Sequence, residues 1–126
     1  MSFISKNCSQ YIKSDIFVRT ITESMENKYL LHGKLTAKPG QQKELAGILI
    51  QASQLVSAAK GCQLYAVSYD KEDEASVYIT EIWDTKTDHD HSLKAEGVRE
   101  LIMKAMPILA VPPTKGQELE VLGGKL

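Results

Sequence analysis

Residues 81–93, with the sequence EIWDTKTDHDHSL, combine one indole ring and two imidazoles with several carboxylates. Side chains of these types can hold a metal ion, exchange protons with a substrate, or begin a helix. His89 and His91 are two positions apart, which on a helix separates them by about 200° around the axis. Two histidines that share an ion need to lie on one face of the helix. We therefore expect no metal site in this stretch.

The same stretch carries the signals of a helix start. Thr85, followed three positions later by Asp88, matches a capping box, in which each side chain satisfies a free backbone amide of the first turn. Asp84, Asp88 and Asp90 also suit the positive end of a helix dipole. We interpret residues 81–93 as the entrance of a helix that borders a pocket.

Three polar side chains here are candidate catalytic residues. His89 is a candidate general base, because a neutral imidazole readily takes a proton near neutral pH; the alternative is a first-turn residue hydrogen-bonded near Asp88. Ser92 follows His89 by about one helical turn and could steady a substrate oxygen. Glu81 would have a raised pKa if it were buried, which makes it a second candidate base, and an ion pair at an edge or interface is the alternative.

The candidate binding residues are mostly aromatic. Trp83 could stack on a flat ligand or anchor the core. Tyr65, Tyr69 and Tyr78 could donate hydrogen bonds to a ligand oxygen, although strand tyrosines often pack with the hydroxyl outward. Gly33 would leave room for a ligand close to the backbone.

Length and charge narrow the class of protein. A chain of 126 residues fits one domain, and a formal charge of −1 with scattered basic residues argues against a nucleic-acid partner. No apolar run approaches the roughly 20 residues that span a bilayer, and charged residues interrupt the apolar patches of residues 1–28. We therefore expect a cytoplasmic protein whose Cys8 and Cys62 are free thiols.

Hydrophobic periodicity divides the chain into an extension and a domain. Residues 1–28 show no sustained period and are interpreted as an N-terminal arm or an alternative start, with the domain at 29–126. Residues 29–38 alternate as a strand does, and apolar residues between 45 and 59 recur at helical spacing up to Gly61. Residues 62–70 and 76–84 predict a hairpin, 98–106 a second amphipathic helix, and 117–124 a last strand.

This order predicts an α+β, ferredoxin-like βαββαβ fold: a four-stranded antiparallel sheet with two helices on one face. Leu30, Leu64 and Leu122 are predicted on the opposite face of the strands. A second apolar face indicates a partner sheet, most simply that of a homodimer.

Four segments in this order resemble the antibiotic biosynthesis monooxygenase (ABM) family over residues 29–126. They are GKLTAKPGQ (33–41), GCQLY (61–65), ITEIWDTKTDHDHSL (79–93) and LEVLGGKL (119–126). The resemblance implies a dimeric α/β barrel and a monooxygenase of quinol- or anthrone-like aromatic molecules that uses no metal or flavin. In such chemistry the ionised substrate reduces dioxygen itself, and the protein binds, orients and deprotonates it. The expected partners are thus a small aromatic substrate, dioxygen and a second copy of the chain.

The site residues of the family match those of this chain only in part. The residues themselves keep His89, Ser92 and Glu81 as the candidate catalytic groups, and Trp83, Gly33, Tyr65 and Tyr78 as the candidate substrate contacts. Many members carry a histidine where this chain has Ser92 and Gly97, and haem-degrading members carry an asparagine where it has Gly33, so haem degradation is disfavoured. The alternative function is a non-oxidative small-molecule binding protein or isomerase of the same fold.

Overall fold

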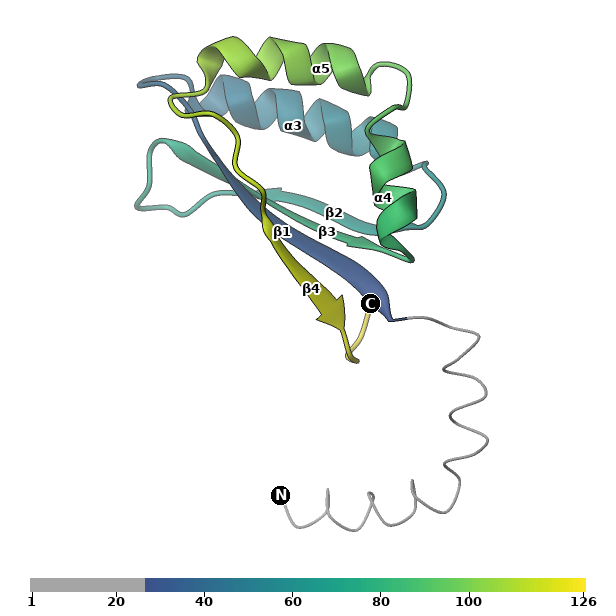
Figure 1. Cartoon of the computed structure of the whole chain (residues 1–126). Coiled ribbons are helices and arrows are strands. Elements are labelled where there is room, and N and C mark those ends of the chain that lie inside the picture. Colours follow the sequence, from purple (N-terminus) through teal and green to yellow (C-terminus); the bar gives the residue numbers. More distant parts are fainter. Residues whose placement is uncertain (1–26) are drawn as a thin grey trace, which may run out of the picture.

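The computed structural model describes residues 27–126, and these residues form one sheet covered by helices (Figure 1). The strands pair in the order β2-β3-β1-β4, and every pair is antiparallel. This arrangement confirms the ferredoxin-like βαββαβ fold. Most of the predicted N-terminal extension, residues 1–26, lies outside the described residues. The elements are β1 (Lys28–Thr36), α3 (Gln42–Val56), β2 (Cys62–Ser68), β3 (Ser76–Trp83), α4 (Lys86–Ser92), α5 (Val98–Ala105), η1 (Met106–Ile108) and β4 (Gln117–Val121).

Helices α3 and α5 lie over the same face of the sheet (Figure 1). The predicted stripe of α3 is buried from Leu45 to Val56, with the exception of Leu55, which stays 42% exposed at the flank of the helix. Apart from Val56, the buried side chains of the stripe pack with Val77 and Leu101 into the main core. The core therefore lies between the long helix and the middle of the sheet. Within residues 27–126, no helix is long and apolar enough to cross a membrane.

The helical region after β3 is broken into two pieces that run in different directions (Figure 1). Gly97, at the start of α5, has a φ of +88°, a conformation that glycine adopts far more readily than other residues. A side chain at this position would also approach the Leu55 side chain to 3.0 Å. The break lets α4 lie against the end of the sheet while α5 packs beside α3.

Helix α4 begins at Thr85, as its sequence predicts. The Thr85 hydroxyl accepts a hydrogen bond of 3.0 Å from the Asp88 amide. The Asp88 carboxylate lies against Gly61, where any Cβ would collide with it, so only the first half of the predicted capping box forms. Gly61, with a φ of +84°, makes the turn into β2 and leaves space for α4.

The sheet face opposite the helices carries a row of apolar side chains. Leu64 pairs with Ile82, Ile82 with Leu30, and Leu30 with Leu119, so the row crosses all four strands. The prediction that Leu122 belongs to this face is wrong, because Leu122 follows the end of β4 and is 85% exposed. Leu119 takes its place, and Glu118 lies on the helix side, opposite Leu31 in the register.

Candidate functional site

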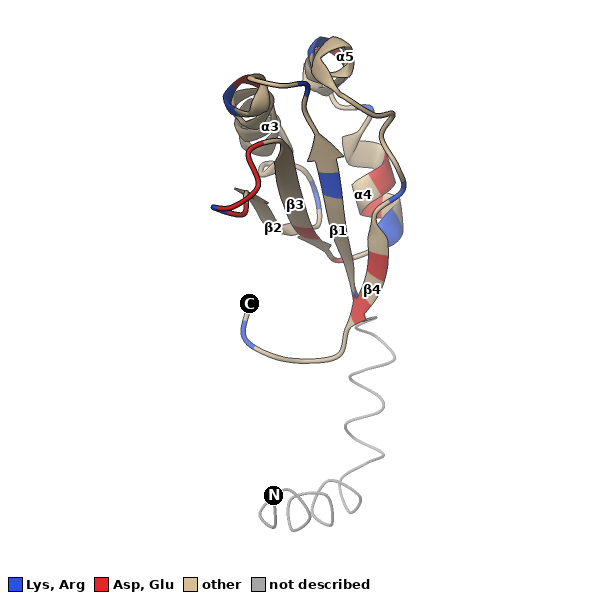
Figure 2. Ribbon diagram, turned by 90° about the vertical axis from the view of Figure 1, so that its left-hand side faces the viewer, with Lys and Arg blue, Asp and Glu red and all other residues tan. Residues whose placement is uncertain are grey.

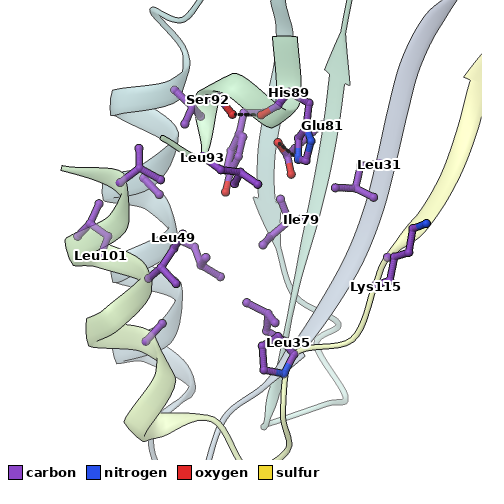
Figure 3. Close-up of a pocket in the computed structure, with 18 of the residues that line it drawn as sticks. Leu31, Leu35, Leu49, Ile79, Glu81, His89, Ser92, Leu93, Leu101 and Lys115 are labelled. Carbon is purple, nitrogen blue, oxygen red and sulfur yellow. Dashed lines mark hydrogen bonds and ion pairs between the residues drawn. The ribbon is translucent and has the colours of Figure 1, made fainter. Parts of the chain in front are cut away.

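A cavity of about 470 Å³ lies between the sheet and the helices (Figure 3). Its deep walls are apolar and come from β1, β3, α3 and α5, including Leu35, Leu49, Ile79 and Leu101. Its polar lining lies mainly at the end where α4 covers the sheet. A cavity of this size and composition is typical of a small-molecule site.

His89 is the central polar residue of the α4 end. The residue is only 8% exposed, and its ring lies 5.5 Å from the Tyr29 ring and 5.9 Å, edge on, from the Trp83 ring, measured between centroids. His89 Nδ1 lies 3.0 Å from a carboxylate oxygen of Asp90, its neighbour in sequence. Two aromatic rings and one carboxylate therefore hold the imidazole in place.

Glu81 lies beside His89 on the floor of the cavity. Its Oε1 atom accepts a hydrogen bond of 3.0 Å from the Trp83 indole and lies 3.9 Å from His89 Nε2. Burial raises the pKa of the Glu81 carboxyl, although the Trp83 hydrogen bond and the nearby His89 act in the opposite direction. A carboxyl held in this way can keep its proton to a higher pH than an exposed one.

Ser92 is also buried at this end of the cavity. Its hydroxyl donates a hydrogen bond of 2.6 Å to the His89 carbonyl oxygen, one turn earlier in α4. The donor is therefore occupied, and the oxygen lone pairs remain as acceptors for a ligand. The structure thus brings His89, Glu81 and Ser92, the three predicted catalytic residues, to one cavity.

Trp83 does not form a wall of this cavity, contrary to its expected stacking role. The side chain is fully buried and packs with Val56 and Val98 in a second, smaller core cluster. Its link to the site is the hydrogen bond to Glu81 and the edge contact with His89. The core-anchor alternative therefore describes its position better.

The tyrosines separate by the face of the sheet on which they lie. Tyr65 lines the cavity, and burial raises the pKa of its hydroxyl. Tyr78 lies on the opposite face, where its ring stacks on His32 with 6.0 Å between centroids, so it has no contact with the cavity. Tyr69 follows the end of β2 and is 56% exposed.

Gly33 does not line the cavity, and a Cβ at this position would lie 4.0 Å from the Gly116 Cα, an ordinary contact. It faces Gly116, where a Cβ would come within 2.9 Å of the His32 carbonyl oxygen and 3.2 Å of the Gly33 Cα. Gly116 therefore lets residues 113–116 approach β1 closely. Those residues form part of the cavity wall.

The sequence interpretation missed Tyr29 as a residue of the site. Tyr29 lines the cavity, and its hydroxyl donates a hydrogen bond of 2.8 Å to Glu118, which is itself paired with Lys115 at 2.7 Å. Burial raises the pKa of the Tyr29 hydroxyl. The strand period did contain this signal, because Tyr29 is two positions before Leu31 and so shares its face.

The mouth of the cavity is partly charged and partly apolar. Lys86 and Asp90 of α4 stand on one side, and Lys115 and Glu118 on the other. In Figure 2, charged residues are coloured on both α4 and β4. Three further lining residues, Leu93, Ile102 and Met106, are 47%, 43% and 49% exposed and form the apolar lip.

His91 does not line this cavity and is exposed, as its spacing from His89 predicts. Among residues 27–126, no group of three or more His, Cys, Asp and Glu side chains is arranged to hold a metal ion. Cys62, also within this range, is a free thiol whose pKa is raised by burial.

Residues 28–103 match the family model for antibiotic biosynthesis monooxygenase. The chain belongs to this family. A Chloroflexus aurantiacus structure assigned to the same family is 34% identical, with a TM-score of 0.70 over 78% of this chain and 96% of that one. A Nitrosomonas europaea protein of unknown function is 24% identical, with a TM-score of 0.68 over 81% and 96%, which supports the fold alone. No curated protein matches the sequence. The family is named for monooxygenase activity, and this name leaves the substrate open.

Proposed function

We propose that this ABM-family protein is a cofactor-independent monooxygenase of quinol- or anthrone-like aromatic molecules. The observation that carries the proposal is a buried imidazole, that of His89, at the polar end of an otherwise apolar cavity. The apolar walls suit the hydrocarbon rings of such a substrate. The polar end supplies the groups that its ionisable hydroxyl needs.

His89 acts as the general base in this proposal. The 3.9 Å between His89 Nε2 and Glu81 Oε1 is too long for a direct hydrogen bond. An oxygen atom can nevertheless lie about 2.8 Å from each of two atoms that far apart. A substrate hydroxyl in this gap gives its proton to Nε2, and the carboxyl of Glu81, when protonated, donates to the oxyanion that remains.

The oxygenation then needs no external reductant for an anthrone-like substrate. The anion transfers electrons to dioxygen, and a bond forms between oxygen and the ring carbon that carries two hydrogens. That carbon loses both hydrogens and becomes a carbonyl, one oxygen atom stays in the product, and the other leaves as water. The protein orients the substrate and keeps water away, for which the buried walls of α3 and α5 are suited.

The proposed protein is a homodimer that pairs through the sheet face opposite the helices. The apolar row of Leu64, Ile82, Leu30 and Leu119 supports this, because its side chains lie adjacent across all four strands. A symmetric contact would cover the row on both copies.

The experiment is oxygen uptake by purified protein treated with a chelator and free of flavin absorbance. Anthrones and quinols are offered under ¹⁸O₂, and the products are analysed by mass spectrometry. We expect uptake above the rate without protein, with one ¹⁸O atom in each quinone formed from an anthrone. Retention of these ligands in native mass spectra without oxygen uptake would contradict the proposal and favour the binding protein or isomerase.

A further inference from the structure

We propose that Asp90 is a positioning residue that holds His89 in the tautomer with the proton on Nδ1, which leaves Nε2 as the basic atom. This inference rests on the proposed function, because the tautomer affects turnover only if His89 takes the substrate proton. Asp90 itself stands at the mouth of the cavity with a half-exposed side chain. Its effect therefore passes through the imidazole.

The contact between His89 and Asp90 is unusual for neighbours on a helix. Consecutive helical side chains point about 100° apart and do not normally meet. Here His89 Nδ1 lies 3.0 Å from Asp90 Oδ1, in the middle of α4. The Tyr29 and Trp83 rings also contact the imidazole, and its two nitrogens face different groups, Nδ1 facing Asp90 and Nε2 lying nearer to Glu81.

An ionised carboxylate only accepts hydrogen bonds, so the proton of a neutral His89 is held on Nδ1. The hydrogen bond from His89 and the nearby Lys86 lower the pKa of Asp90, so the carboxylate stays ionised at neutral pH. Lys86 Nζ lies 3.4 Å from Asp90 Oδ2, which leaves Oδ1 for the imidazole. Among the described residues, a second charged group near the ring is Glu81, which lies on the Nε2 side.

For catalysis, this means that His89 is already in the tautomer that can accept a proton before the substrate binds. Nε2 carries no proton and is the nitrogen nearer to Glu81, where the substrate hydroxyl is proposed to lie. When Nε2 takes the substrate proton, the imidazolium is stabilised by the carboxylate already bonded to Nδ1. Without Asp90, part of the population carries the proton on Nε2 and cannot act.

The test compares the variants D90N and D90E with the control variant D84N. Asp84 pairs with Lys28 and does not line the cavity. Long-range ¹H–¹⁵N spectra of ¹⁵N-labelled full-length protein report which ring nitrogen is protonated. The chain has three histidines, so H32Q and H91Q variants assign the signals. We expect the Nδ1–H form in the starting protein and in D84N, and a mixture of both forms in D90N.

Kinetics provide the second readout. A general base typically accelerates a reaction about 10²–10⁴-fold, and D90N should lose part of this acceleration because part of its His89 carries the proton on Nε2. We therefore expect the kcat of D90N to fall about 10-fold or more, with little change in KM. We expect D90E to recover part of kcat. An unchanged tautomer in folded D90N overturns the role of Asp90, and so does an unchanged kcat. A tautomer change in a protein that consumes no oxygen keeps Asp90 as the group that sets the tautomer and overturns the oxygenase instead.

Discussion

The indole N–H of Trp83 donates a hydrogen bond of 3.0 Å to the carboxyl of Glu81, two positions earlier on the same face of β3. Trp83 is fully buried, and Glu81 lies at the floor of the cavity beside His89. The tryptophan therefore acts as a support that fixes a buried carboxyl at the edge of the proposed site. This arrangement gives the site an acid whose ionisation is linked to the stability of the fold.

Replacing Glu81 by Gln should change the pH dependence of stability. Burial raises the pKa of Glu81 above its ordinary value of 4.5, so above that pH the folded chain keeps a proton that the unfolded chain has released. The contribution of Glu81 to stability is therefore largest below pH 4.5 and is lost as the pH rises through the raised pKa. We expect the melting temperature of E81Q, relative to that of the unchanged protein, to increase from pH 4 toward pH 7.

Calorimetric melts across this pH range provide the measurement. E118Q is the matched control, because Glu118 is paired with Lys115 and its pKa is lowered, so the control should show the opposite trend. A difference between E81Q and the unchanged protein that stays constant across the range contradicts a raised pKa for Glu81.

Replacing Gly116 by Ala should destabilise the contact between residues 113–116 and β1. The added Cβ would lie 2.9 Å from the His32 carbonyl oxygen and 3.2 Å from the Gly33 Cα, and backbone atoms cannot easily move away. Overpacking of this kind costs about 1–3 kcal/mol in the free energy of unfolding. Gly123 has open space around it, so G123A is the control in urea unfolding. Equal stability of the two variants would show that the close approach is not required.

Replacing Leu64 by Asp should break the proposed dimer. Leu64 is 39% exposed in the single chain and belongs to the apolar row opposite the helices. In a paired sheet its carboxylate would be buried without a partner, which is strongly unfavourable. I50D is the control, because Ile50 is 49% exposed on α3. Light scattering after size exclusion should give a monomer for L64D and a dimer for I50D. A dimer for L64D would place the interface elsewhere.

The fold could be predicted from the sequence because its elements carry clear periods. The stripe of α3 identifies a buried face, which is confirmed, and the alternation in β1 identifies the face on which Leu31 and Leu35 line the cavity. The short strand β4 was harder, because alternation alone does not say which of Leu119 and Glu118 faces the helices. The structure assigns Glu118 to the cavity, where Tyr29 and Lys115 satisfy it.

The residues of the site could be predicted only where the regular alternation of side chains along a strand or helix decides which face each residue occupies. Tyr78 is an odd number of positions from Glu81, so its place on the other face of β3 was readable from alternation. Whether Trp83 is a wall or a core anchor depends on Val56 and Val98, which come from distant parts of the chain. The contact between His89 and Asp90 runs against the usual helical geometry, and no sequence rule predicts it.

The most direct test of the account compares H89Q with H91Q in oxygen uptake on an anthrone. Both histidines belong to α4, but His89 is buried in the cavity and His91 is exposed. Because a general base contributes about 10²–10⁴-fold, H89Q should lose at least about 100-fold in kcat, while H91Q should keep the starting rate. Equal rates for folded H89Q and H91Q would contradict the assignment of His89 as the base.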